Sequence, residues 1–122
     1  MIQFTIDKLN CPSWNDMQTM HWSQRRKYMI MVKALTIAAI RKEVKGAKLR
    51  IAEQLPKPCP VSVIAYFKGS NRRDCDNLYV KPIMDGIVFA KLLKDDNCEI
   101  VRPLTIDAFT HQPEDKIVIT LG

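Results

Sequence analysis

One acidic segment combines the residue types and the spacing that metal-dependent chemistry at a phosphate needs. Asp74 and Asp76 stand two residues apart, Lys81 follows them, and the acidic pair Asp95–Asp96 begins fourteen residues after the lysine. In an extended chain alternate residues point the same way, so Asp74 and Asp76 can face one point. Carboxylate oxygens are hard ligands that suit Mg²⁺ or Mn²⁺, and a divalent cation would relieve the repulsion between the acids. The spacing therefore indicates a metal site.

Basic residues around the acids supply the positive charge that a phosphate group attracts. Lys81 follows Asp76 within about one turn, so its ammonium can meet a scissile phosphate or help to activate water. Arg72 and Arg73, just ahead of Asp74, can bind neighbouring phosphates. We also expect two further residues to contact DNA, Lys68 and His21.

Each part of this segment also has an ordinary structural explanation. Asp-x-Asp-Asn and Asp-Asp-Asn are common turn sequences. Lys81 and Asp85 lie four residues apart and can form an ion pair on a helix surface. A calcium loop of the EF-hand type is disfavoured, because the Gly and the Glu that it needs are missing. The chain has no glycine-rich phosphate loop and no nucleophile elbow, so we expect no nucleotide cofactor.

The charge of the chain is unevenly distributed. Residues 1–73 hold 14 Lys and Arg against 4 Asp and Glu, whereas residues 74–122 hold 5 against 9, within a net charge of +6. A basic body around an acidic spot suits a polyanion held beside a cation-binding pocket. A purely solubilising surface charge is the alternative.

Length and composition predict one domain, residues 1–122, with a single hydrophobic core. Apolar residues make up 47% of the chain, but Lys and Arg interrupt the apolar runs, so we expect no membrane span. The first seven residues alternate like a strand and do not resemble a signal peptide, which favours a cytoplasmic protein. No Cys-x-x-Cys pair is present, so we expect free and mostly buried thiols rather than a zinc site or disulfides.

Hydrophobic periodicity and turn residues predict the secondary structure. A helix should begin after Ser23 as its N-cap and end before Gly46. The expected elements, in order, are a strand over 2–6, a long loop over 10–22, a helix over 24–44, a strand over 61–67, a helix over 79–92, and strands over 104–109 and 116–121 that form a hairpin. The order β-α-β-α-β-β predicts an α/β (α+β) fold, a small mixed sheet with two main helices.

The acidic pair poses a spatial problem for this site. A helix over residues 78–92 would be roughly 20 Å long, so the pair would lie far from Asp74 and Asp76 unless the chain turned back. The sequence leaves open whether Asp96 reaches the site from a neighbouring element or from another subunit.

Taken together, these residues resemble a known family, the RusA-type Holliday junction resolvases. The resemblance rests on Arg72–Leu78, then Lys81, Asp85–Ile87 and Asp95–Asp96, and it extends upstream through Pro12–Asn15, His21–Trp22 and the basic helix. It covers nearly the whole chain. This sequence departs from the family pattern by one extra residue between Asn77 and Lys81, and Pro82 follows directly.

The resemblance implies a homodimeric, Mg²⁺-dependent endonuclease that cuts four-way DNA junctions in recombination and repair. Mn²⁺ is a possible substitute for Mg²⁺. The family's metal-binding acids match Asp74, Asp76 and Asp96, and its essential lysine matches Lys81. Asp85 matches a further acid of the family.

Two other functions compete with this expectation. The first is a junction-binding or DNA-binding module without turnover, of a kind found in prophages, which would use the basic helix together with Arg72 and Arg73. Retention of the three acids and the lysine argues against it, because a pure binder gains nothing from anions that face phosphate. The second is an unrelated small α/β enzyme that acts on another phosphate ester.

Overall fold

The computed structural model describes the backbone of residues 1–122 and the side chains of all of them except residues 48 and 49. The main elements follow the expected order, with short helical segments added. They are β1 (Ile2–Asp7), α1 (Trp14–Thr19), α2 (Trp22–Glu43), α3 (Ala47–Glu53), β2 (Cys59–Tyr66), the 3₁₀ turn η1 (Cys75–Asn77), α4 (Lys81–Phe89), β3 (Val101–Phe109) and β4 (Lys116–Leu121). The fold is α+β, as predicted.

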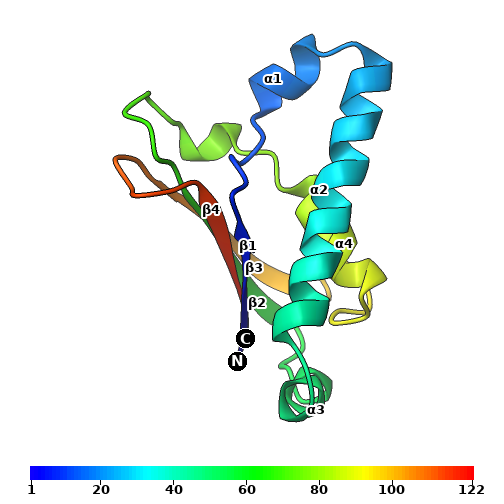
Figure 1. Cartoon of the computed structure of the whole chain (residues 1–122). Coiled ribbons are helices and arrows are strands. Elements are labelled where there is room, and N and C mark those ends of the chain that lie inside the picture. The colour runs from blue at the N-terminus through cyan, green and yellow to red at the C-terminus, as the bar shows by residue number, and fades with distance from the viewer.

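The four strands form one mixed sheet in the order β1-β4-β2-β3. β4 is antiparallel to both β1 and β2, whereas β3 runs parallel to β2. Helices α2 and α4 lie together on one face of this sheet (Figure 1), and α2 contacts both α4 and β1. The sheet and the two helices therefore make two layers with the core between them.

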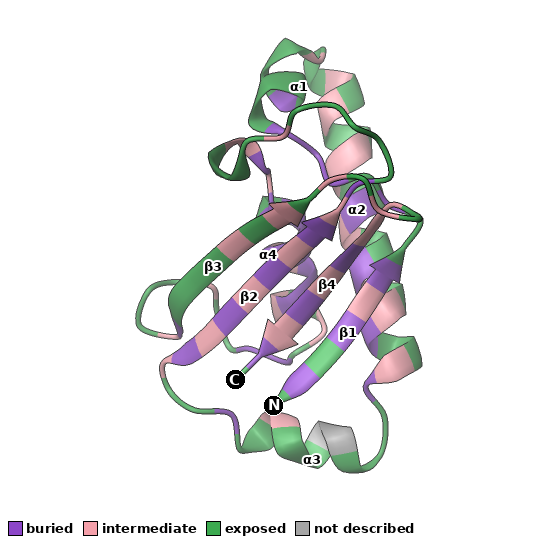
Figure 2. Cartoon of the chain, turned by 90° about the vertical axis from the view of Figure 1, so that its left-hand side faces the viewer, coloured by how far each residue is buried: buried purple, intermediate pink, exposed green. Residues whose placement is uncertain are grey.

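The core comes from alternate residues of the strands. Ile117, Ile119 and Leu121 of β4 are fully buried, as are Val63 and Ala65 of β2. The residues between them are only half-buried, and the resulting stripes are visible along the strands in Figure 2. Each fully buried aliphatic side chain contributes about 1.5–3 kcal/mol relative to exposure, so this alternation holds the sheet against the helices.

The predicted hairpin of the last two strands is wrong. β4 inserts between β1 and β2, and β3 pairs only with β2, in parallel. The physical reason is burial: the inward side chains of β4 are fully buried, which suits a strand paired on both sides. β3 carries Pro103, which lacks an amide donor, and exposed Leu104 and Phe109, so it suits the edge.

The predicted loop over 10–22 contains a helix, α1. Its N-cap is Ser13, whose hydroxyl accepts a hydrogen bond from the Asp16 amide at 3.1 Å. Helix α2 begins at Trp22, earlier than expected, because His21 rather than Ser23 is its N-cap. The Nδ1 of His21 accepts a hydrogen bond from the Ser23 amide at 3.3 Å. Turn-forming residues in this stretch thus act as helix caps.

The second main helix is shorter than predicted. It covers Lys81–Phe89 rather than residues 79–92. Pro82 lies in its first turn, where a missing amide hydrogen is tolerated. Beyond the C-cap Ala90, Lys91 adopts a left-handed φ of 64°, which turns the chain away from the helix axis.

Candidate active site

Lys81 and Asp96 come together in this fold. The Nζ of Lys81, the first residue of α4, lies 2.8 Å from Oδ2 of Asp96 and 3.0 Å from Oδ1 of Asp85. Asp85 is one helical turn further along, so the expected surface pair of Lys81 and Asp85 does form. Asp96 reaches Lys81 within the same chain, which answers the question that the sequence left open for this pair.

The loop after α4 carries Asp96 back to the start of the helix. The Asp96 amide donates to Oδ1 of Asp95 at 2.7 Å, and Nδ2 of Asn97 donates to the other Asp95 oxygen at 3.2 Å. Oδ1 of Asn97 accepts from the Glu99 amide at 2.9 Å. The Asp95 and Asn97 side chains thus brace the loop, while the Asp96 carboxylate faces Lys81.

Hydrogen bonding keeps both members of this pair charged. The hydrogen bond to Asp96, and next the one to Asp85, raise the pKa of Lys81 above its ordinary value. The hydrogen bond from Lys81 lowers the pKa of the Asp96 carboxyl group below its ordinary value. At neutral pH the Lys81 ammonium is therefore paired with a charged Asp96 carboxylate.

Asp74 and Asp76 flank Cys75 in a bent segment rather than an extended one. Residues Cys75–Asn77 form η1, closed by the Asn77 amide on the Asp74 carbonyl at 3.0 Å. The expectation that Asp74 and Asp76 sit at alternate positions of an extended strand is therefore wrong. Both side chains are exposed, and Oδ1 of Asp74 lies 3.2 Å from Nε of Arg72.

A second contact ties this segment to the N-terminal part of the chain. Oδ1 of Asn77 accepts from the Asn15 amide at 3.2 Å, and the Tyr79 amide donates to the Pro12 carbonyl at 2.8 Å. Asn77 thus fixes η1 against the start of α1. Helix α4 has no side-chain cap.

Asp74 and Asp96 line two open hollows that share Leu78, whereas Asp76 lines neither of them. The Asp74 hollow is lined by Ser13, Asn15, Asp16, Arg72, Arg73, Asp74, Asn77 and Leu78. The Asp96 hollow is lined by Trp14, Leu78, Tyr79, Val80, Lys81, Met84, Asp96, Cys98, Val101, Leu104 and Ile106. Leu78 borders both, so the two hollows adjoin on one surface.

The acids are not assembled into a metal site in this arrangement. Among the side chains that the structure describes, no group of three or more His, Cys, Asp or Glu is placed to hold a metal ion. Asp96 binds Lys81 and Asp74 binds Arg72 instead. The donor chemistry of three carboxylates still fits a hard divalent cation, but the three side chains would have to reorient to share one.

The four residues expected to contact DNA have different roles in the fold. Arg72 and Lys68 are exposed. Arg73 packs its guanidinium over the Phe67 ring at 4.2 Å, and its buried Nε has no hydrogen-bond partner among the described residues. His21 caps α2. Lys68 and Arg72 thus present exposed cations, and Arg72 is already paired with Asp74.

Sequence reasoning missed three residues beside the acids. Trp14 and Tyr79 pack edge to face, with ring centroids 4.4 Å apart, and both line the Asp96 hollow. Oδ1 of Asp107, on β3, lies 3.8 Å from the Cys75 sulfur. An isolated Trp in a turn-rich segment and an Asp in a strand carry no spacing signal, so only the fold reveals them.

The four cysteines differ in their exposure to solvent. All four cysteines are free, but Cys75 and Cys98 are exposed, so the expectation of mostly buried thiols holds only for Cys11 and Cys59. Burial raises the pKa of the Cys11 thiol to about 12, which makes it unreactive.

Among the described helices, none has both the length and the apolar character needed to cross a membrane.

None of the protein-family profiles compared with this chain matches it, and no curated protein sequence is significantly similar to it.

Proposed function

We propose that this chain is a Mg²⁺-dependent, structure-selective DNA endonuclease that cuts branched DNA, including four-way junctions formed in recombination and repair. The observation that carries this proposal is the ion pair between Asp96 and Lys81. Lys81 follows closely after the segment that holds Asp74 and Asp76. A helix of the predicted length would have kept Asp96 away from Lys81. The proposal also draws on the resemblance of these residues to the RusA-type resolvases.

The proposed roles follow from the side chains. Asp74, Asp76 and Asp96 would hold Mg²⁺, with Mn²⁺ as a substitute, and the bound ion would polarise the phosphate and lower the pKa of an attacking water. Lys81 would stabilise the negative charge that develops on the phosphate oxygens. Arg72, whose side chain is 88% exposed, would bind a neighbouring phosphate.

The same proposal includes a homodimer acting in the cytoplasm. A four-way junction has two symmetrically related strands to cut, and a two-fold protein dimer would present one site to each.

A second function, a junction-binding or DNA-binding module without turnover, has one specific observation in its favour. Lys81 and Arg72 already neutralise two of the three proposed metal ligands. If those ion pairs persist on DNA, the basic surface would bind and no ion would enter.

The experiment that separates the two functions uses a synthetic four-way junction with Mg²⁺ or Mn²⁺. Wild type should cut it, Asp76→Asn should not, and Asp7→Asn should cut like wild type because Asp7 lies on β1, at the edge of the sheet. Equal cutting by wild type and Asp76→Asn would contradict the proposed endonuclease function. Tight junction binding without cutting under either metal would favour the binding module.

A further inference from the structure

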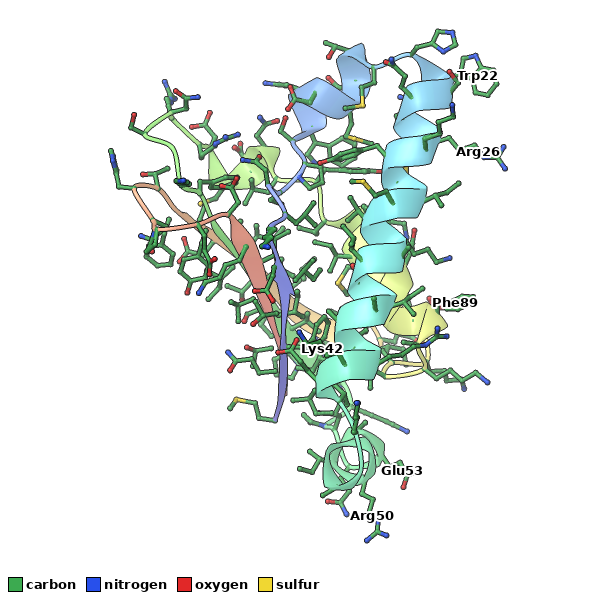
Figure 3. All side chains as sticks on the ribbon, viewed as in Figure 1. Trp22, Arg26, Lys42, Arg50, Glu53 and Phe89 are labelled. Carbon is green, nitrogen blue, oxygen red and sulfur yellow. The ribbon has the colours of Figure 1, made fainter. Side chains whose placement is uncertain are left out.

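A groove runs along the side of α2 and α4 that faces away from the sheet. It is lined by Trp22, Arg25, Arg26, Met29, Ile30, Lys33, Pro82 and Asp85. In Figure 3, Trp22, Arg26 and Phe89 project on this side. We call this surface the α2–α4 groove; it is separate from the sheet face and from the Asp74 hollow.

The α2–α4 groove leads to the candidate active site. Its residues Lys33 and Asp85 also line an adjoining hollow together with Lys81, Val88, Phe89, Asp95 and Asp96. A ligand that follows the groove past Lys33 therefore arrives at Lys81. No other segment of the chain needs to move to open that path, because the α2–α4 groove and the adjoining hollow are both open to solvent.

The charge of α2 favours an anionic ligand. The helix carries six Lys and Arg and a single acid, Glu43. Arg25, Arg26 and Lys33 line the groove, and the one acid among its lining residues, Asp85, is bound by Lys81. A row of cations spaced along a helix suits the repeating phosphates of a nucleic acid.

Exposed aromatic rings mark both ends of this path. Trp22 is 64% exposed and Phe89 is 58% exposed, and neither ring is part of the core. The Nζ of Lys33 lies 4.9 Å from the Phe89 ring centroid, so a cation and a ring are presented together. Aromatic rings between cations are the combination that binds single strands, because unpaired bases stack on the rings while the cations meet the phosphates.

We propose that the α2–α4 groove binds a DNA strand with unpaired bases and guides it to Lys81 and Asp96. The direction of the strand towards that site rests on the proposed endonuclease function, while the binding itself does not. From Trp22 to Lys33 the helix rises about 16 Å, which matches about five stacked nucleotides at about 3.4 Å each. Branched DNA offers such unpaired nucleotides where its arms meet.

A second copy of this chain is the less favourable occupant. A two-fold contact through this face would set Arg25, Arg26 and Lys33 of one copy against the same cations of the other. Like charges brought together in an interface are repulsive, and no acid of the groove is free to offset them, since Asp85 is bound by Lys81.

The test measures binding without cleavage. Labelled oligothymidine and a duplex of the same length are titrated with the full chain in the presence of a chelator. Trp22→Ala should weaken binding of the strand about tenfold and leave the duplex nearly unchanged, because only unpaired bases stack. Phe89→Ala should act in the same direction. Arg26→Ala should lower the slope of log affinity against log salt by about 0.7 for the strand.

Two matched controls lie outside the groove. Phe109→Ala removes an aromatic ring that is 44% exposed on β3, and Lys42→Ala removes a cation further along α2. Both should bind the strand like wild type. Equal losses in Trp22→Ala and Phe109→Ala, or no loss in either, would overturn the proposal. The proposal would also be overturned if Trp22→Ala bound the strand with unchanged affinity but had a smaller mass than wild type in sedimentation. That result would show that the α2–α4 groove binds a second copy of the chain.

The same variants separate this inference from the proposed endonuclease. If wild type cuts no junction but Trp22→Ala still loses the strand selectively, the endonuclease fails and the binding groove stands. If wild type cuts junctions and Trp22→Ala binds and cuts equally well, the groove fails and the endonuclease stands.

Discussion

Asp96 and Asp74 each bind one cationic side chain, but the structure holds the two ion pairs very differently. The side chain of Asp96 is 25% exposed, lies on a loop braced by Asp95 and Asn97, and meets Lys81 on a helix. The Asp74 side chain is 53% exposed and meets Arg72, which is 88% exposed and only two residues away. The first pair joins two elements, whereas the second joins neighbours within one loop.

This difference separates a preorganised half of the site from an adaptable half. The Lys81–Asp96 half is positioned by the packing of α4 against α2, so it has its geometry before any ligand arrives. The Asp74 half sits on exposed loop and turn residues. Asp74 can therefore exchange Arg72 for a metal cation, and the released Arg72 can bind a phosphate. A carboxylate held in this way can change partner at little cost in folding free energy.

The largest expected effect is on cleavage, where both halves should matter. Asp74→Asn and Asp96→Asn should each slow junction cutting by about a hundredfold or more, because each removes a proposed ligand of the ion that activates water. Asp7→Asn is the control, and initial rates under Mg²⁺ are the measurement. If Asp74→Asn cut at the wild-type rate, the Asp74–Arg72 pair would be only a surface contact.

Gly86→Ala should disturb the preorganised half alone. A Cβ at residue 86 would lie 2.8 Å from the Cβ of Thr36, a fully buried residue of α2. We expect a loss of about 1–3 kcal/mol in unfolding free energy, because the helices must separate. Urea denaturation measures it, and the amide signals of residues 95–97 should shift while those of 72–76 stay.

Gly69→Ala is the matched control for that variant. Its added Cβ would have no neighbour nearer than the Asn71 amide nitrogen at 3.9 Å. Unfolding free energy should change by less than about 0.5 kcal/mol. An equal loss in both variants would mean that α2–α4 packing does not position the Lys81–Asp96 half.

Asn77→Ala should loosen the adaptable half. It removes the oxygen that accepts the Asn15 amide and so frees η1 from the start of α1. We expect a loss of about 0.5–1.5 kcal/mol. Hydrogen exchange of the Asn15 amide should become faster, whereas Asn77→Asp, which keeps an acceptor oxygen, should protect it. Unchanged exchange in Asn77→Ala would show that the contact does not hold the turn.

Lys81→Met should have the smallest effect on folding stability, and that effect should depend on pH. Without the ammonium, the pKa of Asp96 should rise towards its ordinary 3.8, which NMR titration of the carboxyl carbon measures. Since Lys81 lowers that pKa in the folded chain, the pair stabilises the fold above pH 3.8 and loses this contribution as pH falls through the lowered pKa. Arg72→Met should leave the Asp96 titration unchanged.

At alkaline pH the contribution of Lys81 to folding stability falls as pH rises. The folded-state pKa of Lys81 is raised above its ordinary 10.5, so its contribution is complete below that pH and is lost only as pH rises through the raised value. At neutral pH wild type should exceed Lys81→Met by about 0.2–1 kcal/mol in unfolding free energy, as for other exposed pairs. A difference that persisted below the lowered Asp96 pKa would have another cause.

The elements with a clear apolar period were predicted closely. The strand over 116–121 has its observed bounds, and the helix over 24–44 is displaced by two residues at its start and one at its end. These segments bury one face, and that face leaves a period of two or of three to four residues in the sequence. Strand order leaves no such trace, because it depends on partners distant in the chain, and the predicted hairpin failed for this reason.

The sequence named a set of candidate site residues, but it did not predict how they are arranged. The length of α4 is decided by Lys91, a non-glycine residue with positive φ, for which the sequence has no signal. The sequence of the 3₁₀ turn at Cys75–Asn77 is typical of any Asp- and Asn-rich loop. The positive φ of Lys91 brings Asp96 back to Lys81, and the 3₁₀ turn leaves Asp74 paired separately with Arg72.

The position of β4 has a consequence for synthesis of the chain. β1 has only one sheet neighbour, β4, and the two strands lie side by side in Figure 1. Ile2 is opposite Leu121 in their register. A nascent chain on the ribosome therefore holds Ile2, Phe4 and Ile6 without their final partners until Lys116–Leu121 has emerged. Contacts of such long sequence separation slow folding. β1 can therefore join the sheet only after β4 has been made, whereas β2 and β3 can pair before it.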